Sequence, residues 1–295
     1  MRFGFFDQLP CAPGFTEQQR YHDILAQIDL GDEVGFDTVW LGELHFSRAF
    51  SILADPLMLL AAASQRTSRI RLGTAVTLLP LHSPVKIAEE AAIVDLLSNG
   101  RLEFGVGRGT APLHYEGYAV PMEESRERFD EALDFIIGAW TSEPFSFEGQ
   151  YFQARELKLT PRPIQSPYPP IRIAANSPDT FPFAGRRGMP IFATPLINPP
   201  DKLKEGLSVY RDTLPSGARG DTALAFPVPC RRKPGGSSRA SRTEPHAVSA
   251  RGGRAVAAAK RRRREKLRGV SPGRGAHGAR DLCRFRPRDG RLRRP

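Results

Sequence analysis

Apolar and polar positions alternate along the first 230 residues in a way that predicts strands and helices in strict turn. Seven short apolar runs have the length and composition of buried strands: residues 3–6, 38–41, 70–79, 102–106, 171–175, 190–194 and 223–228. Between them lie segments whose apolar residues recur at a helical spacing: residues 16–35, 55–68, 84–99, 125–140, 179–187 and 202–214. Residues 145–159 interrupt the alternation and are predicted to form a hairpin. Strand–helix units of about 30 to 40 residues are typical of a parallel sheet.

Such a sheet is either open and doubly wound or closed into an eight-stranded barrel. The open dinucleotide-binding sheet carries a glycine-rich turn after its first strand, and none follows residues 3–6. We therefore predict an α/β fold of the (β/α)8 TIM-barrel type over residues 1–230, incomplete because only six or seven strands are found. An incomplete barrel exposes unpaired strand edges and apolar inner wall. We expect the chain to be poorly soluble alone or to need a partner subunit, as a homodimer or a heterodimer.

Charge changes the picture after Cys230. The whole chain has a formal charge of +11, but residues 231–295 hold 22 basic and 4 acidic side chains, leaving 21 basic and 28 acidic ones before them. Phe285 is the only Phe, Tyr or Trp of this tail, so little apolar area offsets the entropy that ordering would cost. We expect the tail to be disordered. Its abundance of Arg, Gly and Ala favours a frameshift origin over a functional nucleic-acid-binding arm.

Cysteine usage and the apolar runs indicate the compartment. The three cysteines, Cys11, Cys230 and Cys283, are odd in number and lack the spacing of a zinc site, which fits a reducing environment. The N-terminus lacks the apolar core of a signal peptide, and no run approaches the roughly 18 apolar residues of a membrane span. We expect a cytoplasmic protein with no membrane association.

Candidate acid–base groups follow the second predicted strand. Residues 35–46 end in Glu43, Leu44, His45 and Phe46, and catalytic groups in strand–helix proteins collect at the C-terminal ends of the strands. An imidazole beside a carboxylate can take up or release a proton near neutral pH. His45 and Glu43 are therefore predicted to be catalytic. A lone histidine in such a run serves as often as a structural hydrogen-bonding group, and that alternative stays open.

Candidate phosphate ligands follow the fourth and fifth predicted strands. Arg108 comes directly after Gly107, and a guanidinium held at a strand end can bind a phosphate through two hydrogen bonds. Asn176, Ser177 and Thr180 lie just past the fifth strand, at the start of the next helix, where short polar side chains suit phosphate oxygens. These residues could equally cap that helix, and the two roles do not exclude each other.

Four segments, in this order and spacing, resemble the bacterial luciferase-like flavin monooxygenases: residues 35–46, 73–76, 104–109 and 174–177. The resemblance covers about residues 1–228. It implies a (β/α)8 barrel that uses reduced FMN, supplied by a flavin reductase, and O2 to oxygenate a small organic substrate. It also implies that Arg108, Asn176, Ser177 and Thr180 hold the flavin phosphate, although many members carry a carboxylate where this chain has Asn176. Members have a non-proline cis peptide at the position of Ala75 and Val76, under the flavin ring.

The chain departs from the luciferases proper at Leu44, where they carry the histidine tied to light production. We therefore expect a general flavin oxygenase and no aldehyde bioluminescence. The loop at residues 110–121 is expected to form a wall of the substrate pocket through His114 and Tyr115. Leu44, at the end of the second predicted strand, is expected to be a pocket residue as well. His82 is predicted equally well as a loop-packing residue or a ligand contact. The alternatives are a deazaflavin-dependent hydride transfer on the same fold, an inactive truncated remnant, and polyanion binding through the tail.

Overall fold

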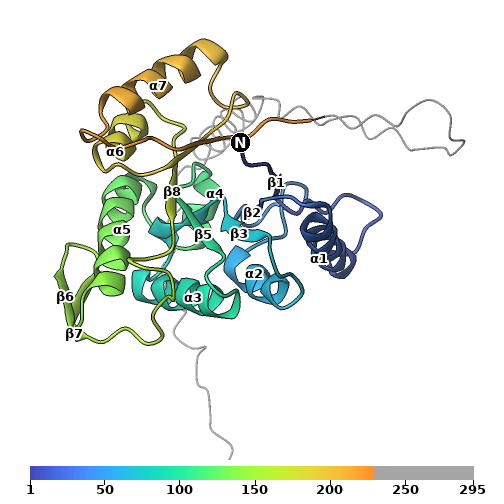
Figure 1. Cartoon of the computed structure of the whole chain (residues 1–295), viewed down its shortest axis with the longest axis horizontal. Coiled ribbons are helices and arrows are strands. Elements are labelled where there is room, and N and C mark those ends of the chain that lie inside the picture. The colour runs from blue at the N-terminus through green and yellow to red at the C-terminus, as the bar shows by residue number, and fades with distance from the viewer. Residues whose placement is uncertain (229–295) are drawn as a thin grey trace, which may run out of the picture. The chain divides into compact units, whose positions relative to one another are not determined.

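The computed structural model describes residues 1–228, in which one curled, mostly parallel sheet forms a half-barrel (Figure 1). Its strands follow the order β1-β2-β3-β5-β8-β9-β10, and β4 pairs with β5 beside this path. The strands are β1 (Gly4–Asp7), β2 (Thr38–Leu41), β3 (Arg71–Thr74), β4 (Thr77–Leu78), β5 (Leu102–Gly107), β8 (Ile171–Ala174), β9 (Ile191–Ala193) and β10 (Thr222–Leu224). The predictions of a disordered and frameshift-derived tail concern residues 231–295, which lie outside the described part.

The strands along the path pair in parallel, as the alternating sequence predicts. Val39 of β2, for example, lies between Phe5 of β1 and Leu72 of β3. At the two ends of the path, Arg2 before β1 forms an ion pair of 3.3 Å with Asp221 before β10. The curl of the sheet therefore brings the segment before β1 within reach of the segment before β10, although the two end strands do not pair.

Helices alternate with the strands at the predicted places. They are α1 (Glu17–Val34), α2 (Pro56–Ser64), α3 (Pro84–Leu97), α4 (Pro112–Gly117), α5 (Ser125–Thr141), α6 (Thr180–Arg186) and α7 (Pro200–Asp212), with short 3-10 turns η1 (Leu79–Leu81) and η2 (Met122–Glu124). Helix α3 packs between α2 and α5 outside the strands, and α6 packs on α7 (Figure 1). The predicted hairpin is present as β6 (Phe145–Glu148) and β7 (Gln153–Leu157). Within residues 1–228, none of the helices has both the length and the apolar character that crossing a membrane requires.

Local sequence explains where the helices begin and end. Thr16 and Gln19 form a reciprocal capping box at the start of α1, and Gly35 ends this helix in the left-handed conformation. Asp55 caps α2 by accepting a hydrogen bond of 3.0 Å from the Met58 amide, and Pro56 occupies the first turn. These signals fix the segments that connect each strand to the next helix, where the candidate site residues lie.

Two segments differ from the sequence prediction. Residues 70–79, predicted as one strand, form β3 and β4 separated by a cis peptide between Ala75 and Val76. Glycines on both sides make room for this bend: a Cβ on Gly42 would lie 3.1 Å from the Ala75 carbonyl oxygen, and one on Gly107 would lie 2.5 Å from Val76 Cγ2. Residues 110–121, predicted as a loop, contain the short helix α4, which begins with a proline that favours the first helical turn.

Candidate active site

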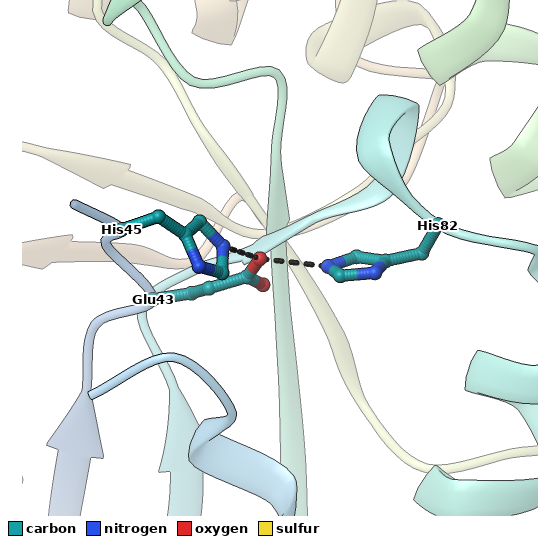
Figure 2. A group of neighbouring side chains, drawn as sticks. All are labelled: Glu43, His45 and His82. Carbon is teal, nitrogen blue, oxygen red and sulfur yellow. Dashed lines mark hydrogen bonds and ion pairs between the residues drawn. The ribbon is translucent and has the colours of Figure 1, made fainter. Parts of the chain in front are cut away.

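A buried carboxylate joins two histidines where β2 and β4 end. Oxygen Oε1 of Glu43 lies 2.7 Å from Nε2 of His45 and 2.7 Å from Nε2 of His82, and Figure 2 shows both rings pointing at this one oxygen. The other oxygen, Oε2, accepts a hydrogen bond of 2.8 Å from the Leu78 amide. Glu43 and His45 are each 4% exposed, and His82 lies closer to the surface. The structure thus joins the two predicted catalytic residues and adds His82 as a third member.

Electrostatics favour an ionised Glu43. Burial alone would raise the pKa of this carboxyl, but hydrogen bonds from His45 and His82 outweigh burial and lower it. Burial would lower the pKa of His82, yet its hydrogen bond to Glu43 and the charge of Glu43 raise it above the ordinary value. The pair is therefore a carboxylate facing an imidazole that holds its proton more firmly than usual.

Hydrogen bonds around His45 fix which of its nitrogens carries a proton. Because Glu43 Oε1 only accepts, Nε2 of His45 donates to it. Nitrogen Nδ1 of His45 then accepts from the Tyr118 hydroxyl, 3.3 Å away. The His45 amide donates to Nε2 of His114 at 3.2 Å, so neutral His114 carries its proton on Nδ1. Burial and the neighbouring His45 lower the pKa of His114, which favours that neutral form.

The predicted phosphate ligands also lie together. A guanidinium nitrogen of Arg108, just after β5, donates to the Ser177 hydroxyl at 3.1 Å, and this hydroxyl lies 2.8 Å from that of Thr180. Ser177 lies between β8 and α6, and Thr180 is the first residue of α6. Residues 69 positions apart therefore present one cation and two hydroxyls at the C-terminal edge of adjacent strands.

Two charged residues of this group were missed by sequence reasoning. Asp179 lies 2.5 Å from a guanidinium nitrogen of Arg126 in α5 and 3.7 Å from one of Arg108. Burial would raise the pKa of Asp179, but a hydrogen bond from Ser177 and the charges of Arg126 and Arg108 lower it. Arg126 lies in the first turn of α5, and a basic side chain at such a place in the sequence is not a specific signal for a phosphate site. Two arginines therefore meet here, and within residues 1–228 a carboxylate partly neutralises them.

Several buried polar atoms have no hydrogen-bond partner within residues 1–228, and among them are Oδ1 of Asn176 and Nδ1 of His114. Asn176 directly precedes Ser177, and His114 contacts the His45 backbone. Buried polar atoms without partners are rare, because each loses hydrogen bonds to water and gains none. The Asn176 acceptor, next to Ser177 in the chain, and the His114 donor, beside His45, are therefore suited to bind polar groups of a ligand.

The remaining predicted residues hold the backbone around these groups. The Ala75 amide donates to the Leu41 carbonyl at 2.7 Å, and the Glu43 amide donates to the Val76 carbonyl at 3.3 Å, which ties the cis peptide to the end of β2. Tyr115 is 2% exposed, packs on Leu78 and Leu81, and donates its hydroxyl to the Arg108 carbonyl. Leu44 is half-buried, and its amide donates to the Leu53 carbonyl. The assignment of Leu44, His114 and Tyr115 to a substrate pocket stays a prediction.

A cavity of about 250 Å³ opens beside the Glu43 cluster, between the first turns of α2 and α3. Glu43, His82 and Tyr118 form one side of it, and Asp55, Lys86 and Glu90 contribute charges. The hydroxyl of Thr77, which also lines it, is buried without a partner in the described residues. Glu43 and His82 thus both line the cavity, and His82 is the more exposed of the two.

Comparison with known proteins gives one consistent result. The sequence model of the family described as luciferase-like monooxygenase matches residues 1–279, which includes part of the segment after residue 230 where we found no resemblance. The oxygenase component of a flavin-dependent trigonelline monooxygenase from Acinetobacter baylyi is 32% identical over 199 residues, 66% of this chain and 55% of that protein. The chain spans about half the length of the curated relatives it matches.

Solved structures agree with the fold. The monooxygenase RslO1 from Streptomyces bottropensis superposes with a TM-score of 0.69 at 34% identity, over 72% of this chain and 65% of that one. A coenzyme F420-dependent tetrahydromethanopterin reductase from Methanopyrus kandleri superposes with a TM-score of 0.57 over 76% of this chain and 65% of that one. At 20% identity, this second likeness concerns the fold alone.

Proposed function

The chain belongs to the luciferase-like monooxygenase family, and from that premise we propose that it is a flavin-dependent monooxygenase. It uses reduced FMN and O2 to place one oxygen atom on a small organic substrate. A flavin-dependent oxygenase is among its relatives. The chain spans about half the length of that relative, so the oxygenation reaction is proposed and not taken over from it.

The grouping of Arg108, Ser177 and Thr180 carries this proposal. A flavin mononucleotide ends in a phosphate, and a guanidinium with two hydroxyls at strand ends and a helix start matches its oxygens in charge and hydrogen bonding. Arg126 adds a second positive charge within reach of the same group. The unpartnered Oδ1 of Asn176 suits a hydroxyl donor such as those of the flavin side chain. The residues present therefore fit FMN.

The Ala75–Val76 segment is proposed to lie under the flavin ring. Both residues are half-buried, and their backbone is fixed by hydrogen bonds to Leu41 and Glu43. When bound, the reduced flavin supplies the electrons that activate O2. The protein's part is to hold the cofactor by its phosphate, keep the ring against this segment and exclude water.

His45 is the proposed acid–base residue. Its Nδ1 is the nitrogen able to accept a proton, since Nε2 donates to Glu43. The buried donor Nδ1 of His114 can hydrogen-bond a substrate or cofactor oxygen nearby. Glu43 orients His45, and Leu44 and Tyr115 complete the proposed substrate pocket. In His45→Ala, loss of substrate oxygenation with retained FMN binding supports this role, and unchanged oxygenation contradicts it. The control is His22→Ala, at an exposed histidine of α1.

A deazaflavin is the second candidate cofactor, favoured by the fold likeness to the F420-dependent reductase. Its reaction would be hydride transfer without oxygen. Anaerobic titration with reduced FMN and with a reduced deazaflavin separates the two cofactors. We expect tighter binding of reduced FMN and, after ¹⁸O₂ is admitted with a panel of small organic molecules, a product carrying one ¹⁸O atom. Preference for the deazaflavin with no label incorporated would overturn the proposal.

Partner proteins follow from the chemistry. A flavin that arrives reduced must be reduced elsewhere, so a flavin reductase is the proposed partner, and the trigonelline relative is itself named as one component of a system. We also propose that the chain acts as a homodimer or heterodimer. Light scattering of the purified chain, alone and with candidate reductases, tests both partnerships.

A further inference from the structure

The shared oxygen of Glu43 makes His82 more than a neighbour of the proposed catalytic residue. Both imidazoles point Nε2 at Oε1 with equal separations of 2.7 Å (Figure 2). Oε2 is already held by the Leu78 amide, so the carboxylate cannot rotate to offer each histidine its own oxygen. His45 and His82 therefore bind the same negatively charged oxygen, and a change in the protonation of one alters the interaction of the other with it.

We propose that His82 is a positioning residue that acts on His45 through Glu43. Together, His82 and the Leu78 amide fix the carboxylate, and the fixed carboxylate holds His45 with its proton on Nε2 and its Nδ1 unprotonated beside the Tyr118 hydroxyl, where it can accept a proton. A base oriented by a third group is a recurrent device in enzymes, because the wrong tautomer cannot take up a proton at the working nitrogen. This inference rests on the proposed acid–base role of His45.

The cavity makes this arrangement sensitive to pH. Glu43 and its bonded partners lie on one side of His82 and Tyr118 lies on another, while Asp55 at the start of α2 and Lys86 and Glu90 in the first two turns of α3 line the same cavity. His45 is 4% exposed, whereas the His82 side chain is 22% exposed and can exchange protons with water in the cavity. When His82 is protonated, its positive charge binds Oε1 more strongly and weakens the hydrogen bond from His45. When His82 is neutral, the hydrogen bond from His45 is stronger. Solution pH thus reaches the buried His45 through His82.

Histidine-selective ¹⁵N NMR on the full chain tests the proposal without any flavin or substrate. The chain has 6 histidines, so the signals can be assigned by single substitutions. In the wild-type protein, neutral His45 should show a protonated Nε2 and an unprotonated Nδ1, and its signals should shift as His82 titrates. In His82→Gln, which keeps an amide donor for Glu43 but cannot be protonated, that pH-dependent shift should be lost.

Lys86→Gln is the matched control, because it removes a positive charge from the same cavity without touching Glu43. There the shift of the His45 signals should persist. A His45 that carries its proton on Nδ1, or His45 signals that shift equally in His82→Gln, would overturn the proposal. The tautomer is measured in the wild-type protein, so a poorly folded variant does not prevent a decision. Failure of the flavin proposal alone would leave these NMR results unchanged.

Discussion

Replacement of Asp179 by Asn should tighten FMN binding, although it removes ion pairs. Asp179 lies 2.5 Å from Arg126 and 3.7 Å from Arg108, the two arginines proposed to hold the phosphate. An incoming phosphate must therefore compete with this carboxylate for the same guanidinium groups. Asn keeps the size of the side chain and removes its charge, so the competition from Asp179 ends, while Asp130 stays 3.9 Å from Arg126.

The magnitude follows from exposure. The Asp179 side chain is 52% exposed and that of Arg126 is 27% exposed, so solvent screens the pair, which contributes about 0–1 kcal/mol. Removing the competitor should lower the Kd for FMN by up to about fivefold, since 1.4 kcal/mol corresponds to tenfold. The free energy of unfolding should fall by up to about 1 kcal/mol at neutral pH. Because the pKa of Asp179 lies below its ordinary value of 3.8, its contribution is present above that value and is lost as the pH falls through the lowered pKa.

Flavin fluorescence titration with FMN and with riboflavin, which lacks the phosphate, is the assay. Asp179→Asn should tighten FMN binding and leave riboflavin binding unchanged. Asp134→Asn is the matched control, because Asp134 pairs with Arg187 at the end of α6 in a similar surface ion pair. Weaker FMN binding in Asp179→Asn, or an equal gain for riboflavin, would refute the competition between carboxylate and phosphate.

Three further outcomes are expected. Arg108→Ala should weaken FMN binding by about 1.5–3 kcal/mol, the range for a hydrogen bond to a charged group, and leave riboflavin binding unchanged. Arg162→Ala is the control. Equal losses in titrations with the two flavins would contradict the phosphate role of Arg108. His82 stabilises the fold below its ordinary pKa of 6.5 and loses this effect as pH rises through its raised pKa, so urea unfolding should show a loss of stability on the alkaline side that His82→Gln abolishes. Gly107→Ala places a Cβ 2.5 Å from Val76 Cγ2 and should lower stability by about 1–3 kcal/mol, measured by thermal unfolding; an unchanged melting temperature would show that Val76 moves freely.

The order of strands could be predicted because it depends on local patterns. Six of the seven predicted apolar runs became single strands of the parallel sheet, residues 70–79 split into β3 and β4, and β2, β5 and β8 lie within a residue of their predicted ends. Strand ends in a parallel sheet share one edge, so Arg108 and Ser177 could be expected near each other before their 3.1 Å contact was seen.

The contacts across the site could not be predicted in the same way. His82 reaches Glu43 from 39 positions away, after a cis peptide that turns the chain between β3 and β4. Arg126 meets Asp179 from 53 positions away, because α5 and the start of α6 lie side by side there. Such pairs depend on how whole helices pack, and neither spacing nor composition records that.

The most direct test of the proposed phosphate site is a crystal structure of the chain with FMN bound. We expect phosphate oxygens within hydrogen-bond distance of Arg108, Arg126, Ser177 and Thr180, with Asp179 turned away from the arginines. A phosphate bound elsewhere, for example beside Lys86 in the cavity between α2 and α3, would contradict it.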